Sequence, residues 1–155
     1  MEQWARERPD LDASPMGVIG RISRLARLLD VELARTFSKH GLDRPSFDVL
    51  ATLRRAGPPH RLTPAELTSS SMVTSGAITQ RLDRLEKRGL ITRTPSELDG
   101  RCVYVALTGE GLELIERALP DHVANEQRLL ATITPAQRKT LADILRKLLE
   151  ARGDT

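Results

Sequence analysis

Small, hydrogen-bonding and basic side chains gather between positions 71 and 101 of this sequence. Such side chains suit the surface of a nucleic-acid duplex: lysine and arginine reach phosphates, glutamine pairs with adenine, and arginine pairs with guanine. The chain has only 3% aromatic residues, which disfavours a stacking platform for single-stranded bases. Ten residues are candidates for contacts with double-stranded DNA: Ser71, Thr74, Ser75, Gly76, Thr79, Gln80, Arg84, Lys87, Asp99 and Arg101.

One helix, beginning near position 74 or 75 and ending at 88, should carry most of these candidates. At about 100° per residue, Ile78, Leu82 and Leu85 share one face, which must lie in the core. The opposite face then carries Gln80 and Lys87, together with Gly76 and Asp83, and is flanked by Thr79 and Arg84. Serine and threonine at the start of this helix can donate to a phosphate beside its positive end.

Two segments with strand character, residues 90–94 and 102–107, follow this helix and are separated by a polar turn at 96–101. They predict a hairpin, the wing, beside the DNA-reading helix. Arg101 at its tip can enter the minor groove, and Asp99 can hold an arginine in position. The alternative is a surface turn with an exposed ion pair.

A second, shorter helix is expected just before the helix at 74–88, and the two together predict a helix-turn-helix. Thr63 and Glu66 form a capping-box pattern that opens a short helix, and a turn is expected at residues 69–71. A long helix should run from a Ser14 cap to Gly41, and another should begin at Pro45. After the wing, caps at Thr108 and Thr134 open the remaining helices, of which the first either continues or restarts at Pro120.

The helices at both ends carry broad apolar stripes, at Val18, Ile22, Leu25, Leu29, Leu33 and Phe37 and at Leu141, Ile144, Leu145, Leu148 and Leu149. Pairing of two chains is the simplest way to bury them, and an intramolecular bundle is the alternative. We predict one domain over residues 1–155, mainly α with a minor β part: a winged helix-turn-helix at 42–108 and dimerisation helices at 1–41 and 109–155.

Enzyme chemistry finds no support in the sequence. His40, His60 and His122 lie in separate segments without metal-ligand spacing, and no nucleophile motif or phosphate-binding glycine loop is present. We therefore predict no catalysis, no cofactor and no metal, and expect the histidines to be surface or capping residues. A lone cysteine, Cys102, favours a reducing cytoplasm, and a redox role for it is the less favoured interpretation.

The charge balance permits nucleic-acid binding without proving it. The chain has 155 residues, with 24 basic and 21 acidic side chains and a formal charge of +3. Charged residues interrupt every apolar run well before the roughly 20 residues that a membrane span needs. We expect no membrane partner.

Three motifs carry a resemblance to the MarR family of bacterial regulators. They are Ile78-Thr-Gln-Arg-Leu-Asp-Arg-Leu-Glu-Lys-Arg-Gly-Leu-Ile-Thr-Arg93, Asp99-Gly-Arg101 and Val105-Ala-Leu-Thr-Gly-Glu-Gly111. One departure is Gly100, where the family usually has arginine, so one phosphate contact is lost. The resemblance implies a two-fold dimer that binds a palindromic operator, usually represses, and is released by a small anionic or aromatic effector.

A narrower resemblance is to the urate-responsive branch of that family, on the matching positions Trp4, Asp48 and Arg81 and on residues 119–128. Arg81 is also unusual by geometry, because it lies only about 70° from the centre of the apolar face. A cation there needs a partner, either Asp48 or an anionic ligand. The ligand would be urate, another purine or an aromatic acid, drawn to Arg81 and repelled by Asp48; the alternative is a structural salt bridge, with Trp4 packing on the dimer.

Two other functions fit the same pattern. The winged helix could bind a protein without reading DNA, since a fold does not determine its function. A regulator of this type could also respond to phenolic compounds or to oxidants.

Overall fold

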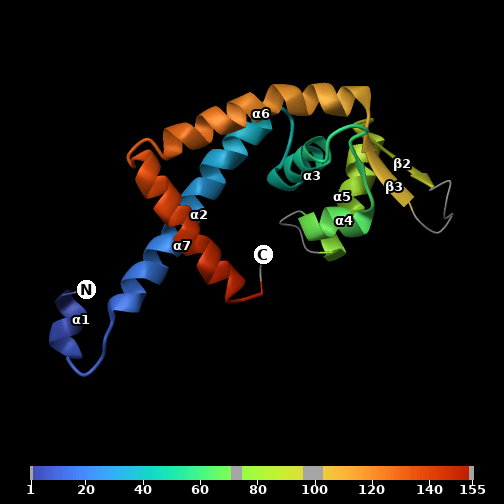
Figure 1. Cartoon of the computed structure of the whole chain (residues 1–155). Helices are drawn as coiled ribbons and strands as arrows, with labels where there is room; N and C mark the ends of the chain where they lie inside the picture. Colours follow the sequence, from blue (N-terminus) through green and yellow to red (C-terminus); the bar gives the residue numbers. More distant parts are fainter. Residues whose placement is uncertain (1, 71–74, 96–102, 154–155) are drawn as a thin grey trace.

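The computed structural model describes residues 2–70, 75–95 and 103–153, except the side chains of residues 70 and 75–77. The fold is mostly helical, with one small three-stranded sheet. Long helices α2 (Ser14–Lys39), α6 (Gly109–Leu129) and α7 (Pro135–Glu150) form a framework, and a lobe with the sheet lies at one end of it (Figure 1). The short helix α1 (Glu2–Glu7) lies at the opposite end of α2 from this lobe (Figure 1).

The first long helix begins one residue earlier than the predicted cap implies. Ser14 is already helical, and its N–H donates to Asp12 Oδ1 at 2.9 Å. The Asp12 carboxylate, and not the Ser14 hydroxyl, therefore accepts a backbone N–H at the start of this helix. The helix ends at Lys39, where Gly41 has a φ of 64°. Only glycine adopts this left-handed conformation without strain, which explains the predicted stop.

Two helices of the lobe are capped by side chains close in sequence. In α3 (Arg44–Arg55), Asp43 accepts the Ser46 N–H at 2.8 Å, and Pro45 lies in the first turn. In α4 (Pro64–Ser70), Thr63 and Glu66 form the predicted reciprocal cap: the Thr63 N–H donates to Glu66 Oε2 at 2.7 Å, and Thr63 Oγ1 accepts the Glu66 N–H at 3.2 Å.

The prediction of a turn at residues 69–71 was wrong for residues 69 and 70, because α4 continues to Ser70. The hydroxyls near its end bond to carbonyls one turn earlier, Thr68 to Pro64 at 2.8 Å and Ser69 to Glu66 at 3.0 Å. These hydroxyls therefore do not compete for the helical N–H groups, and the helix is not interrupted.

The wing strands are β2 (Ile91–Pro95) and β3 (Val103–Leu107), paired antiparallel with Ile91 opposite Leu107. A third strand, β1 (Arg61–Leu62), pairs with the other edge of β3 and was not predicted. Two residues are too short to show an alternating pattern. The guanidinium of Arg61 lies 4.7 Å from the centre of the Tyr104 ring, which adds a cation–π contact across this pairing.

Both late caps are confirmed. Thr108 accepts the Gly111 N–H at 3.0 Å at the start of α6, and Thr134 and Gln137 form a reciprocal capping box at the start of α7. Thr108 also donates to the carbonyl of Gly89 at 2.7 Å, which joins the turn after α5 (Ser75–Lys87) to α6. Helix α6 runs through Pro120 without a break.

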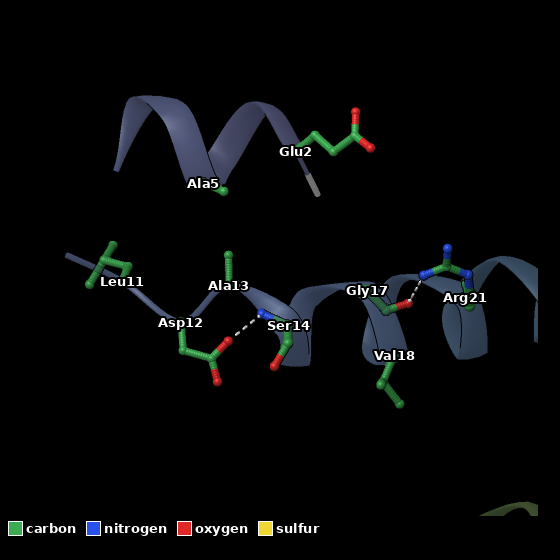
Figure 2. Close-up of a pocket in the computed structure, with 9 residues that line it drawn as sticks. All are labelled: Glu2, Ala5, Leu11, Asp12, Ala13, Ser14, Gly17, Val18 and Arg21. Atoms are coloured by element: carbon green, nitrogen blue, oxygen red, sulfur yellow. Dashed lines mark hydrogen bonds between the residues drawn. The ribbon is translucent and has the colours of Figure 1, made fainter. Parts of the chain in front are cut away.

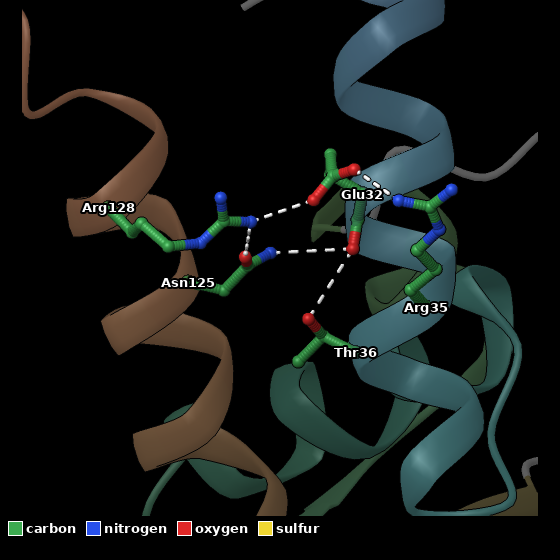
Figure 3. Close-up of polar contacts among 5 residues, drawn as sticks. All are labelled: Glu32, Arg35, Thr36, Asn125 and Arg128. Atoms are coloured by element: carbon green, nitrogen blue, oxygen red, sulfur yellow. Dashed lines mark hydrogen bonds and ion pairs between the residues drawn. The ribbon is translucent and has the colours of Figure 1, made fainter.

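The buried core lies in the lobe and at its junction with α2 and α6. Among the residues whose side chains the structure describes, fifteen hydrophobic ones form it, and Leu50, Leu53, Leu67, Leu85, Ile91 and Ile115 are fully buried. Outside the lobe, α2 and α6 are joined by a polar network (Figure 3). Arg128 donates to Glu32 at 2.7 Å and to Asn125 at 2.8 Å, and Arg35 donates to Glu32 at 2.6 Å.

The predicted apolar stripes are only partly covered within one chain. Large hydrophobic side chains remain exposed along α2, at Met16, Val18, Ile19, Ile22, Leu25, Leu28 and Val31, and along α7, at Leu141, Ile144, Leu145, Leu148 and Leu149. Phe37, at the end of the α2 stripe, is instead buried against the lobe. Among the described helices, none combines the length and the apolar character that crossing a membrane requires.

Candidate nucleic-acid interface

Helix α5 (Ser75–Lys87) has the buried and exposed faces that its periodicity predicts. Ile78, Leu82 and Leu85 are 5%, 3% and 0% exposed, whereas Gln80 and Lys87 on the opposite side are exposed. Thr79 and Arg84, which flank that side, are exposed as well. The outward surface of α5 therefore offers an amide, a hydroxyl and two cations to a macromolecular partner.

The acidic side chains of α5 face the wing. Arg93, on β2, donates through Nε to Glu86 Oε2 at 2.9 Å, and its Nη2 lies 2.7 Å from Asp83 Oδ1. We expected Asp83 on the outward face, but this contact turns it toward β2. The Arg93 guanidinium holds the pKa of Glu86 below its usual range. The carboxylates that would repel DNA phosphates are thus partly neutralised within the protein.

The basic side chains of α5 lie on its other flank, where α3 begins. Burial opposes the ionisation of Asp43, but hydrogen bonds from Ser46 and the charges of Arg81 and Arg84 keep its pKa below the usual range. The structure thus places Arg81 in the electrostatic environment of Asp43. Its Nη1 atom is buried and has no hydrogen-bond partner in the described part of the chain. A buried, unpaired guanidinium nitrogen is costly unless a ligand satisfies it.

The other two predicted effector residues, Asp48 and Trp4, lie on α3 and α1. Asp48 lines a hollow of about 390 Å³ between α3 and α6, together with Thr52, Arg54 and Glu116, and Arg81 is not part of its wall. Trp4 belongs to α1 and is 45% exposed. Since α1 lies at the far end of α2, one chain does not bring Trp4 to Arg81 or Asp48 (Figure 1).

A second hollow, of about 460 Å³, lies between α1 and the start of α2 (Figure 2). Its wall is mainly apolar, with Ala5, Leu11 and Val18, and Arg21 lies at one end, where it donates to the Gly17 carbonyl at 2.7 Å. This part of the molecule is remote from the lobe that holds the DNA-contact candidates (Figure 1).

Several predicted residues cannot be placed. Ser71, Thr74, Asp99, Arg101 and Cys102 lie outside the described residues, and for Ser75 and Gly76 only their position in the first turn of α5 is described.

The histidines differ from our expectation that all three are surface or capping residues. His40 does cap α2 through its backbone N–H, which donates to the Phe37 carbonyl at 3.0 Å. His122, however, packs at the junction of α2, α3 and α6, with ring centres 5.2 Å from Phe37 and 4.6 Å from Phe47. Its side chain is 16% exposed, and this partial burial was missed because it depends on helices distant in sequence. Within the described residues, no group of histidines, cysteines and carboxylates has a metal-binding arrangement.

Comparisons with known proteins agree with this geometry. A sequence model of the MarR family matches residues 40–101. The HTH-type transcriptional regulator PecS of Dickeya dadantii is 43% identical over 145 residues, which cover 94% of this chain and 87% of PecS. The fold and the exposed face of α5 define a winged helix-turn-helix protein, and the chain belongs to the MarR family of DNA-binding transcription regulators.

Among the similar solved structures are two that contain DNA. Sco3205 of Streptomyces coelicolor, in complex with DNA, is 29% identical with a TM-score of 0.84, and the match covers 91% of this chain and 92% of that one. A cysteine-to-serine mutant of MarR from E. coli, complexed with operator DNA, is 28% identical with a TM-score of 0.75, covering 94% and 97%. These relatives are regulators and not enzymes, as the sequence predicted.

Proposed function

We propose that this protein is a homodimeric repressor that binds a palindromic operator and releases it when a small anionic or aromatic effector binds. The observation that carries DNA binding is the arrangement of α5, which exposes Gln80 and Lys87 while its acidic side chains contact Arg93. Sco3205 and MarR, which share the fold, are known in complexes with DNA.

Dimerisation is supported by the exposed apolar side chains of α2 and α7. A monomer that displayed both stripes would present a large apolar surface to water. A second copy that covers them by two-fold symmetry also places two α5 helices on one duplex, with half-sites about one helical turn apart. The operator should therefore be an inverted repeat.

In the complex, the start of α5 contacts phosphates, its outward face reads bases, and the wing enters the minor groove. Ser71, Thr74 and Ser75 donate to phosphate, Gln80 pairs with adenine, and Arg84 reaches guanine or phosphate. Gly76 permits close approach, and Thr79 and Lys87 border the same surface. Arg101 belongs to the wing contact, and Asp99 holds an arginine in position there.

A gel-shift experiment on the DNA upstream of the protein's own gene, repeated at several salt concentrations, tests this function. Gln80→Ala should reduce sequence discrimination, whereas Lys87→Ala should weaken binding to every duplex and lower the salt slope by about 1. A protein-binding module would show no preference between this DNA and an unrelated duplex of equal length.

The effector site we propose is centred on Arg81, whose buried Nη1 has no hydrogen-bond partner in the described residues. An anion such as urate, another purine or an aromatic acid would satisfy it, and repulsion of the anion by Asp48 would shift α5 relative to α3. Trp4 would reach this site from the second protomer, since its own α1 lies far from the lobe. Its ring would stack on the planar ligand.

Thermal-shift measurements with purines and aromatic acids identify the effector. A true effector should stabilise the parent but neither Arg81→Ala nor Trp4→Ala, and should release DNA only from the parent. Release of DNA from Arg81→Ala by the same compound would remove Arg81 from the site.

A further inference from the structure

A hollow of about 450 Å³ lies between the C-terminal half of α5 and the beginning of α3. Its wall includes Gly41, Asp43 and Ser46 on one side and Arg84, Lys87 and Arg88 on the other. We propose that this hollow is a phosphate-binding site. The proposal deepens the proposed function by adding Arg88 to the contact surface and by naming the chemical group that the site accepts.

The charge of the hollow favours an anion. Three cationic side chains face one carboxylate, Asp43, which already accepts the Ser46 N–H as the cap of α3. In the part of the chain that the structure describes, the side chains of Arg84, Lys87 and Arg88 make no hydrogen bond and no close ion pair. The positive end of the α3 dipole points to the same place. An external anion would therefore meet cations whose charge is not neutralised by close pairing.

These cations are not needed to cap α5. Three carbonyls of its last turn accept backbone N–H groups: the Arg88 N–H donates to Arg84 at 3.2 Å, the Gly89 N–H to Glu86 at 2.8 Å, and the Leu90 N–H to Leu85 at 3.0 Å. Basic side chains at a helix end commonly serve such carbonyls. Here they are free to bind a ligand.

The Arg88 side chain lies beside Gly41 in the wall of the hollow. Gly41 has a φ of 64°, and a Cβ at that position would lie 3.7 Å from Arg88 Nη2. The guanidinium thus lies over the turn that joins α2 to α3. Arg84 lies one helical turn earlier on α5, and two forked guanidinium groups at this spacing can share the oxygens of one phosphate.

The hollow borders the surface that reads DNA. Lys87 and Gln80 lie only about 20° apart around the helix, since seven residues make nearly two turns. The edge of the hollow therefore continues the outward face of α5. A backbone phosphate beside the groove entered by α5 has the right charge and location, and a free phosphorylated compound has the same chemistry.

The first test measures DNA affinity of the full-length protein against salt concentration. Arg88→Gln should bind operator and unrelated duplexes about five- to tenfold more weakly and lower the salt slope by about 1. Arg117→Gln is the matched control, because it removes one charge from an exposed position of α6, and it should bind as the parent does. Arg88→Met, which also removes the charge and keeps a side chain of similar length, replaces Arg88→Gln if circular dichroism shows that the latter is unfolded.

The second test identifies the source of the phosphate. Single methylphosphonate substitutions remove one backbone charge at a time around the operator half-site. If DNA supplies the phosphate, one such substitution should weaken binding by the parent but not further weaken binding by Arg88→Gln. If a free compound supplies it, pyrophosphate should raise the Tm of the parent and not that of Arg88→Gln.

The proposal is overturned if Arg88→Gln retains the parent's salt slope and pyrophosphate stabilises both proteins equally or neither. Operator binding by the parent in the same series reports separately on the proposed function. A parent that bound no DNA would contradict that function, and the pyrophosphate arm would still decide whether the hollow binds phosphate.

Discussion

Arg93, on β2, donates through Nε to Oε2 of Glu86, on α5, at 2.9 Å. The backbone N–H of Arg93 donates to the other carboxylate oxygen of Glu86 at 3.2 Å, so the carboxylate holds both the side chain and the strand. The first strand of the wing is therefore fixed to α5, the helix proposed to read DNA. The positions of β2 and α5 relative to each other are therefore already fixed before a duplex binds to them.

We expect Glu86→Gln to weaken DNA binding about three- to tenfold, because the wing must then be ordered during binding. Removal of a negative charge near DNA would by itself strengthen binding, so the two effects have opposite signs. Fluorescence anisotropy with an operator duplex measures the difference. Tighter binding by Glu86→Gln would show that Glu86 acts only through its charge.

The network around Glu32 should make the stability of the protein depend on acid pH. The hydrogen bond from Arg128 holds the pKa of Glu32 below its ordinary value of 4.5. A carboxyl with a lowered folded-state pKa stabilises the fold above its ordinary value and loses this contribution as the pH falls through the lower value. Glu32→Gln should therefore be less stable than the parent at neutral pH, with the difference shrinking below pH 4.5.

Urea denaturation at fixed protein concentration, followed from neutral to acid pH, measures this effect. Glu150→Gln, at an exposed position near the end of α7, is the control and should follow the parent at every pH. A constant difference between Glu32→Gln and the parent across the acid range would show that the network is not the cause.

Two glycines at the start of α6 provide a matched pair for packing. A Cβ on Gly111 would lie 1.9 Å from the carbonyl oxygen of Leu90, a backbone atom that cannot move away easily, whereas a Cβ on Gly109 has no atom within 4 Å. We expect Gly111→Ala to lower the free energy of unfolding by about 3 kcal/mol. Gly109→Ala should raise it by up to about 1 kcal/mol through helix propensity. Equal stability of the two variants would contradict the close contact.

Leu145, on the exposed stripe of α7, tests dimerisation. A buried glutamate at a dimer interface would be strongly unfavourable, so Leu145→Glu should sediment as a monomer and lose most of its operator affinity, because half-sites require two linked copies. Glu150→Lys changes charge on the opposite face of the same helix and should remain a dimer. A dimeric Leu145→Glu protein would place the interface elsewhere.

Local features were predicted well where neighbouring residues determine them. The caps at Thr63, Thr108 and Thr134 and the stop at Gly41 each depend on atoms within a few residues. Features that depend on distant segments were missed or misplaced. Strand β1 exists because β3 offers it an edge, and the burial of His122 depends on two phenylalanines from α2 and α3.

The sequence by itself determined which faces of α5 are buried and exposed, because the 3.6-residue period orders side chains around a helix without reference to anything else. The family could also be predicted from the sequence, because its three motifs are stretches of consecutive residues. Only the tertiary structure decided what lies beside each flank of α5: Arg93 beside the acidic residues, and Asp43 beside the arginines. Those partners come from β2 and from the start of α3, and packing of the core sets their positions, which no local pattern encodes.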